Sequence, residues 1–341
     1  MLLSAVSLSF LMALGLGQVQ QQTLPPNEGG AWEKISKSLV LIEQGGKPMG
    51  YAVLIDPSGL FLTHSSAIGA GMVSAKTRSG QPVSLITLTI DEPTQLVLLQ
   101  AQIWSDKEAT AISVETGKGL KGKQLLAALP SGPIPGTLVA NDRNGVMRPS
   151  LRYVPLSEIR FETPNDRVGG SPVFTLDGKL VGLLNATLEP MGAPSGLAGS
   201  QKSVAAPPAA SERNDGSQNS GYAGPVGVTV AYALNGDVLQ RVVDGFRSPY
   251  RKATHPTIGA FFSDAVGQGA AIQAILPDSP SSKADLRPGD VVLAVDDVPV
   301  RDHFDLAVIL FKQAVGKTLT LVVKRGEQTL KLAVTVGKQP D

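Results

Sequence analysis

The histidines and cysteines of this sequence limit the chemistry that the chain can perform. Among 341 residues there are three histidines, His64, His255 and His303, and no cysteine. The lack of cysteine excludes disulfide scaffolds, zinc–thiolate sites, iron–sulfur clusters and cysteine nucleophiles. His255 and His303 share no metal-ligand spacing with His64 or with nearby carboxylates, so we predict no metal site and expect both side chains to be solvated.

A glycine-rich stretch at residues 117–123 imitates a phosphate-binding loop. Gln124, however, stands where such a loop needs the Ser or Thr that reaches Mg²⁺. We therefore interpret this stretch as a basic surface loop and predict no cofactor.

One set of residues has the types needed for nucleophilic catalysis. His64 could act as the base, Asp91 could orient it, and Ser171 could attack, while the preceding pair Gly169-Gly170 leaves backbone amides for an oxyanion. Serine peptidase chemistry through these three residues is therefore one hypothesis. The alternative without catalysis is that His64 is a polar loop residue and Ser171 a small residue filling a tight turn.

Charge and hydropathy indicate the compartment. Thirty Lys and Arg against 29 Asp and Glu give a net charge of +1, which argues against a nucleic-acid binder. Residues 2–16 are apolar or small, a run shorter than the ~20 residues of a membrane span. We predict a cleaved signal peptide at 1–17, a disordered spacer at 18–31 and an exported, periplasmic or extracellular protein without a stable membrane span.

Short apolar or alternating runs, broken by Gly, Pro, Asn and Asp, recur from residue 32 to residue 247. This spacing is typical of an antiparallel barrel or sandwich and predicts a mostly β domain. Residues 187–222 are rich in Pro, Ala, Ser and Gly and are expected to be a disordered insertion. Apolar residues at helical spacing predict an amphipathic helix over 237–246, and residues 248–256 are a predicted linker that basic side chains keep solvated.

The C-terminal unit, residues 257–338, resembles a PDZ domain in the circularly permuted form of the HtrA/Deg family of envelope proteases. The matching motifs are Ser279-Pro280, Ala284-Asp285-Leu286, Pro288-Gly289-Asp290-Val291-Val292 and residues 295–300. The resemblance implies a small β-barrel with two helices. Asp302 is a predicted helix cap, and Asp296-Asp297 is expected to serve a turn rather than catalysis.

The same resemblance implies a peptide-binding groove. Thr257-Ile258-Gly259-Ala260 stands where the family presents backbone amides to a C-terminal carboxylate, and the adjoining strand can accept a peptide by β-augmentation. Phe261, Phe262 and Leu310 suggest a preference for an apolar C-terminal residue. The sequence leaves open which row of the second PDZ helix faces the groove.

Upstream, residues 32–247 resemble the trypsin-like double six-stranded antiparallel β-barrel of the same family. The resemblance rests on residues 50–63 as the first hairpin, on Gly169-Gly170-Ser171-Pro172 as the nucleophile loop, and on residues 178–182 as the hairpin after it. The family's catalytic histidine, aspartate and serine would fall at Ser66, Gln95 and Gly169. None of the three has the required chemistry, because glycine has no attacking atom, serine is no base and neutral glutamine cannot stabilise an imidazolium.

We therefore interpret the chain as an exported HtrA/Deg-like pseudoprotease, an adaptor or scaffold in envelope protein quality control. It would bind protein C-termini or unfolded segments through its PDZ groove and would not bind nucleic acid. The alternative is an active serine endopeptidase that uses His64, Asp91 and Ser171. The resemblance also implies a homo-oligomer, a trimer in many family members.

Overall fold

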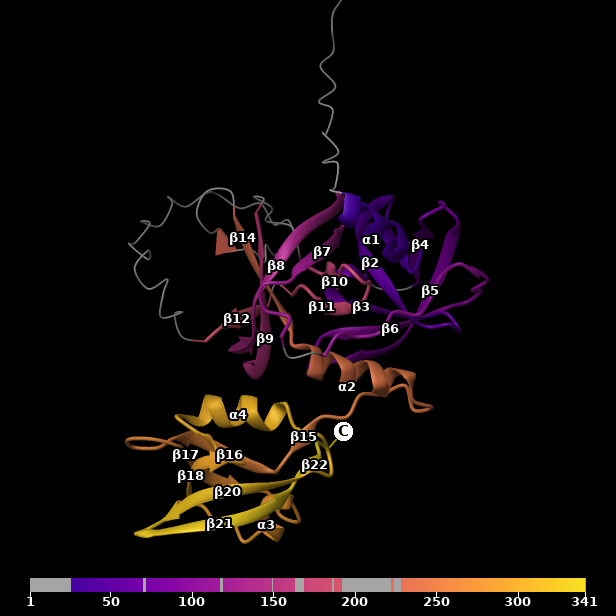
Figure 1. Ribbon diagram of the computed structural model, residues 1–341. Coiled ribbons are helices and arrows are strands. Elements are labelled where there is room, and N and C mark those ends of the chain that lie inside the picture. The colour runs from indigo at the N-terminus through magenta and orange to yellow at the C-terminus, as the bar shows by residue number, and fades with distance from the viewer. Residues whose placement is uncertain are drawn as a thin grey trace, which may run out of the picture.

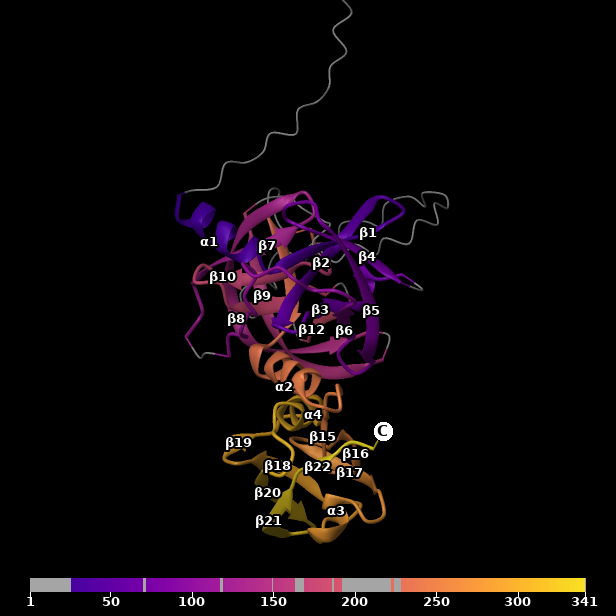
Figure 2. The same ribbon diagram turned by 90° about the vertical axis from the view of Figure 1, so that its right-hand side faces the viewer.

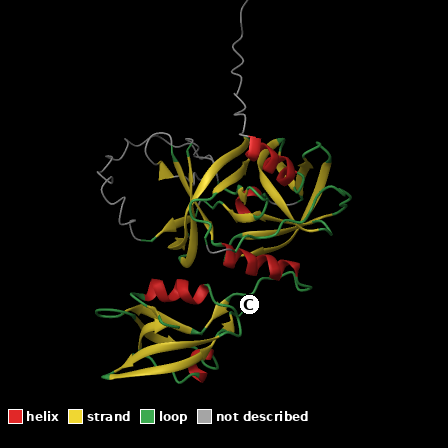
Figure 3. Cartoon of the chain, in the orientation of Figure 1, coloured by secondary structure: helices red, strands yellow, loops and turns green. Residues whose placement is uncertain are grey.

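The computed structural model describes residues 26–69, 72–116, 119–148, 150–162, 169–185, 187–191, 222–223 and 228–340. The predicted signal peptide and most of the predicted insertion lie outside these residues. Figures 1 and 3 show two bodies rich in strands, the larger formed by the described residues between 26 and 247 and the smaller by the C-terminal domain. The mostly β prediction is confirmed.

Barrel 1 is a closed antiparallel sheet in the order β1-β2-β3-β6-β5-β4. Its strands are β1 (Leu39–Gln44), β2 (Lys47–Asp56), β3 (Leu60–His64), β4 (Val73–Thr77), β5 (Pro82–Asp91) and β6 (Leu96–Ala101). Side chains alternate along each strand, so one set fills the barrel, where Val40, Leu54 and Phe61 are fully buried. A single 3₁₀ turn, η1 (Ser65–Ala67), follows β3.

Barrel 2 contains six main strands in the order β11-β10-β7-β8-β9-β14, and a bridge between Leu184 and Ala233 joins its two ends. These strands are β7 (Gln124–Leu129), β8 (Gly132–Met147), β9 (Arg152–Phe161), β10 (Pro172–Thr175), β11 (Leu180–Leu183) and β14 (Thr229–Leu234). Two short strands lie within the predicted insertion, β12 (Leu188–Pro190) and β13 (Tyr222–Ala223). The insertion is therefore ordered at its start, because Leu188 is buried and β12 pairs with β8.

Two helices flank the barrels. α1 (Pro26–Ser36) begins inside the segment predicted to be a disordered spacer, and that prediction is wrong from residue 26 onward. Pro26 is suited to the first helical turn, and Ala31 and Ile35, four residues apart, are buried. α2 (Gly236–Arg247) confirms the predicted helix, and Asn235 caps it by accepting a hydrogen bond from the Val238 amide.

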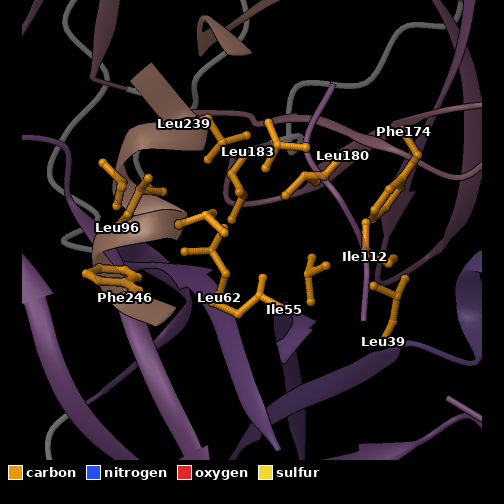
Figure 4. Close-up of a cluster of buried hydrophobic side chains, with 14 of the residues drawn as sticks. Leu39, Ile55, Leu62, Leu96, Ile112, Phe174, Leu180, Leu183, Leu239 and Phe246 are labelled. Atoms are coloured by element: carbon orange, nitrogen blue, oxygen red, sulfur yellow. The ribbon is translucent and has the colours of Figure 1, made fainter. Parts of the chain in front are cut away.

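The two barrels share one apolar core that α2 seals. Leu62 and Leu96 of barrel 1, Leu183 of barrel 2 and Leu239 and Phe246 of α2 converge there (Figure 4). Packing of side chains from barrel 1, barrel 2 and α2 thus fixes the two barrels relative to each other.

The C-terminal domain is a sheet in the order β16-β17-β18-β20-β21 with two helices, α3 (Pro280–Lys283) and α4 (His303–Phe311). Its strands are β15 (Pro256–Thr257), β16 (Ala260–Asp264), β17 (Ala270–Ile275), β18 (Val291–Val295), β19 (Val298–Pro299), β20 (Thr318–Arg325), β21 (Gln328–Thr335) and β22 (Gly337–Lys338). Asp302 caps α4, as predicted. In this sheet β16 pairs on one side, with β17, so its other edge is open to a further strand.

The junction between the domains corrects two predictions. His255 is not solvated: it is 6 % exposed, and its Nε2 lies 2.8 Å from Asp91 Oδ1 of β5. Its ring stacks on Phe311 of α4 with the ring centroids 5.6 Å apart. Arg247 donates from Nε to the Ile55 carbonyl at 2.8 Å, so it anchors the start of the linker rather than keeping it solvated. Figure 2 shows α2 and α4 facing each other across this junction.

His303 is also less solvated than predicted. Its Nδ1 lies 2.7 Å from Asp264 Oδ1, and its ring contacts Tyr153 of β9 and Phe304. The linker and the start of α4 therefore both hold the C-terminal domain against the barrels.

Replacing Phe246 with Ala tests the role of α2 in the shared core. Phe246 is 1 % exposed, so Phe246→Ala removes a packed ring and leaves a cavity. We expect the free energy of unfolding, measured by urea denaturation, to fall by about 3–5 kcal/mol. The control is Tyr250→Ala, whose side chain is 89 % exposed and whose loss should cost no more than about 0.5 kcal/mol. Equal losses for the two variants would contradict the packing role assigned to α2.

Candidate functional site

His64 ends β3 and caps the 3₁₀ turn that follows it. Its Nδ1 accepts a hydrogen bond from the Ser66 amide at 3.1 Å and lies 2.8 Å from Ser66 Oγ. A neutral imidazole whose Nδ1 accepts carries its proton on Nε2, and this nitrogen is buried without a partner among the described residues. The lone pair that a catalytic base would use is thus engaged by the turn itself.

Burial lowers the pKa of His64 to about 4. The side chain is 3 % exposed, because β3 pairs with β6 on one side and η1 folds over its end. Removal of water disfavours the imidazolium and leaves the ring neutral at neutral pH. His64 is therefore a buried capping residue at the end of a strand, and the prediction that it is a polar loop residue is wrong.

Ser66 lies against the glycine loop that precedes β10. A Cβ placed on Gly170 would lie 3.1 Å from Ser66 Oγ, so the two residues are neighbours across the barrels. Gly169 is the residue before Gly170, and residues 163–168 lie outside the described part of the chain. Ser66 therefore lies beside the loop that holds Gly169, the position to which the family resemblance assigns the nucleophile.

Gln95 lies in the turn between β5 and β6 and has a left-handed backbone with φ of 60°. Its carbonyl accepts a hydrogen bond from the Ser65 amide at 2.9 Å, which fixes it beside the turn that carries Ser66. Its side-chain oxygen accepts from Thr187 Oγ1 at 3.4 Å. Ser66, Gln95 and Gly169 are thus gathered at one junction between the barrels.

The set His64, Asp91 and Ser171 is differently arranged. The Asp91 carboxylate accepts hydrogen bonds from Thr94 and pairs with His255, not with His64. Ser171 is 1 % exposed, and the amide of Gly170 before it donates to the Leu184 carbonyl at 2.7 Å. Among the described residues, no hydrogen bond joins any two members of this set.

A second candidate site is a cavity of about 320 Å³ beside α4. Its lining residues are Ser150, Leu151, Arg152, Tyr153, Pro256, Thr257, Ile258, Ala260, Phe262, Ala307, Leu310 and Phe311. Of the residues predicted to bind peptide, Thr257, Ile258, Ala260, Phe262 and Leu310 line it. Ala307, Leu310 and Phe311 are the residues of α4 that face it, which identifies the row that the sequence left open.

Gly259 and Phe261 lie outside that lining. Gly259 has φ of +69°, and a Cβ there would come within 2.4 Å of the Ser279 Cβ, so the tight turn requires glycine. Its amide donates to Thr257 Oγ1 at 3.0 Å. Phe261 is 58 % exposed, because successive side chains of a strand point to opposite faces and that of Phe262 lines the cavity.

Sequence reasoning missed the contribution of barrel 2 to this cavity. Ser150 and Leu151 lie in the turn between β8 and β9, and Arg152 and Tyr153 begin β9. All four precede the C-terminal domain by about a hundred residues. No local pattern marks a contact of this range. The left-handed Leu151, with φ of 50°, is a feature that only the structure reveals.

Within the described ranges, no three His, Asp or Glu side chains are grouped so as to hold a metal ion. None of the helices described there is both long and apolar enough to cross a membrane.

Comparisons with known proteins agree with this architecture. A family model described as PDZ domain matches residues 256–336. A probable periplasmic serine endoprotease DegP-like of Halomonas elongata is 25 % identical over 303 residues, covering 86 % of this chain and 57 % of its own length. The protein of the same description from Rickettsia conorii is 22 % identical, with 85 % and 53 % covered. This chain thus spans a little over half the length of the curated relatives it matches.

Solved structures show the same fold. The HtrA-type protease AlgW with decapeptide has a TM-score of 0.60 at 15 % identity and covers 92 % of this chain and 99 % of its own. The serine endoprotease from Yersinia pestis has a TM-score of 0.54 at 14 % identity, with 93 % and 100 % covered. With two barrels, a PDZ domain and DegP-like relatives along most of its length, the chain is HtrA/Deg-like in sequence and fold.

Proposed function

We propose that this protein is an exported pseudoprotease that binds protein C-termini or extended segments through its PDZ groove, as an adaptor or scaffold in envelope protein quality control. The proposal depends mainly on one observation, the position of Ser66 against Gly170. In a protease of this family the catalytic base and the nucleophile would meet at this place. At the positions that the family resemblance assigns to the catalytic groups, Ser66 supplies no base, Gln95 no carboxylate and Gly169 no attacking atom.

The burial and hydrogen bonding of His64 support the same conclusion. A general base works best with a pKa near the pH at which it operates, and a buried imidazole with a pKa lowered to about 4 is far below that range. Its accepting nitrogen is also occupied by the Ser66 amide.

One observation favours the rival enzyme. Ser66 is exposed, and its Oγ lies 2.8 Å from His64 Nδ1, the distance at which a base activates a serine. This pair lacks an orienting carboxylate, because Asp91 is held by His255. The catalytic test below therefore includes Ser66 as well as Ser171.

The groove supports the binding half of the proposal. Its lining combines the apolar side chains of Ile258, Phe262 and Leu310 with an open edge of β16 along which a peptide strand can pair. AlgW, which shares the fold, was solved with a decapeptide. The periplasmic description of the relatives supports the proposed export, and assembly into trimers stays a prediction.

The first prediction concerns catalysis. The purified protein should neither cleave unfolded casein nor be labelled by a fluorophosphonate probe, because losing a serine protease triad lowers kcat on the order of 10⁶-fold. Trypsin at the same concentration is the positive control. Labelling that disappears in Ser66→Ala or Ser171→Ala would contradict the proposal and identify the nucleophile.

The second prediction concerns His64 and pH. An unfolded histidine has a pKa near 6.5, whereas burial lowers that of His64 to about 4. Between these pH values the unfolded chain binds a proton that the folded chain does not, so stability is full above pH 6.5 and falls as the pH drops toward 4. The loss approaches about 3 kcal/mol.

Urea denaturation at a series of pH values measures this effect. His64→Gln should remove that part of the pH dependence, while the share that comes from carboxylates remains. If the free energy of unfolding falls equally steeply with pH in the wild type and in His64→Gln between pH 4 and 6.5, then folding does not lower the pKa of His64.

The third prediction concerns the groove. In an array of decapeptides that differ in the last residue, we expect the full-length protein to prefer apolar C-termini with a free carboxylate. Phe262→Ala should weaken the tightest peptide about tenfold or more, since a buried aromatic side chain contributes about 1.5–3 kcal/mol.

The matched control is Phe261→Ala, which removes the neighbouring ring outside the cavity lining and should leave the dissociation constant unchanged. Thermal melting of both variants confirms that each is folded at the assay temperature. Binding that ignores the terminal residue and its carboxylate would refute the proposed groove.

A further inference from the structure

The cavity beside α4 has one cation in its lining, together with apolar side chains and the hydroxyl groups of Ser150, Tyr153 and Thr257. Of the described residues that line it, Arg152 alone carries a formal charge. It comes from β9 of barrel 2, whereas the loop at 257–260 and the helix α4 come from the PDZ domain. A ligand that fits this lining has one anionic group next to apolar side chains.

Arg152 lies at the end of the groove where the loop begins. Its Cζ is 5.9 Å from the centroid of the Phe311 ring, and Phe311 is the last residue of α4. The Phe311 ring also stacks against His255, which immediately precedes Pro256 and Thr257 of β15. The guanidinium is thus near the loop that the family resemblance assigns to the carboxylate.

The loop itself has a reduced supply of donors. The amide of Gly259 is engaged by the Thr257 hydroxyl at 3.0 Å, and the Gly259 carbonyl accepts from the Leu276 amide. A carboxylate bound there needs donors from elsewhere, because its desolvation must be matched by hydrogen bonds.

The present partner of Arg152 is weak. Its Nη1 donates to the side-chain oxygen of Gln339 at 3.2 Å, a neutral acceptor. Burial lowers the pKa of Arg152, and Asp91 opposes that effect. The Asp91 carboxylate, however, is already hydrogen-bonded to His255 and Thr94. A carboxylate from a ligand would form a stronger, charge-assisted bond than the Gln339 amide does.

We propose that Arg152 binds the terminal carboxylate of the peptide ligand, so that barrel 2 and the PDZ domain together form one peptide site. This inference rests on the proposed function, since it names a residue that reads the C-terminus. The barrel domain would then take part in recognition, with Arg152 as a specificity-determining residue. Leu151, exposed at the rim of the same cavity, adds apolar surface beside it.

The test compares two forms of one peptide on the full-length protein. The probe is the tightest decapeptide of the array above, labelled with fluorescein at its amino end and prepared with a free or an amidated C-terminus. Fluorescence anisotropy gives both dissociation constants for the wild type, Arg152→Gln, Arg152→Lys and the control Arg160→Gln. Arg160 lies on the same strand, is paired with Glu162 and is outside the cavity lining.

We expect the wild type and Arg160→Gln to prefer the free carboxylate by the same factor. In Arg152→Gln that factor should shrink about tenfold or more, chiefly because the free acid binds more weakly, and Arg152→Lys should restore part of it. The same factor in Arg152→Gln and the wild type would overturn the inference alone. Failure of the wild type to bind either form would instead overturn the proposed function, and the inference with it.

Discussion

The hydrogen bond between Asp91 and His255 fixes where the PDZ domain lies on the barrels. Both side chains are more than nine-tenths buried, and a buried carboxylate is tolerated only with matched donors, here the imidazole and the Thr94 hydroxyl. Because His255 also stacks on Phe311, the same contact holds the end of α4 beside β5 of barrel 1, while Phe311 itself packs on barrel 2. The cavity that joins residues of both domains exists because this junction holds them together.

The two candidate sites differ in what their side chains do. At the junction of the barrels, the backbone brings Ser66 and Gln95 beside the glycine loop. The His64 side chain caps the turn that carries Ser66, and the backbone carbonyl of Gln95 braces the same turn. Beside α4, the side chains form a lined cavity with an open strand edge. The proposed function rests on this contrast between a junction occupied by Ser66, Gln95 and Gly169 and a groove that has an apolar lining and an open strand edge.

The strands, α2 and the PDZ domain could be predicted from the sequence because turn residues and apolar periods are local signals. The helix at Pro26 was missed because Gly29 and Gly30 make its composition resemble a spacer, although Ala31 and Ile35 have helical spacing. His255 was predicted to be solvated, since its partner Asp91 is 164 residues away and no local pattern reveals such a pairing. Arg152 was missed for the same reason: only the packing of two domains gives it a role.

Phe311 belongs to the PDZ helix by sequence but to barrel 2 by packing. Its ring joins the cluster formed by Met147, Val154, Leu156, Leu188, Tyr232, Leu234 and Val238. Separating the domains would expose this apolar surface on both, so neither can loosen without a cost to the other. The boundary that the sequence suggests between two domains is therefore crossed by a shared apolar cluster, so unfolding of either domain takes a packing partner from the other.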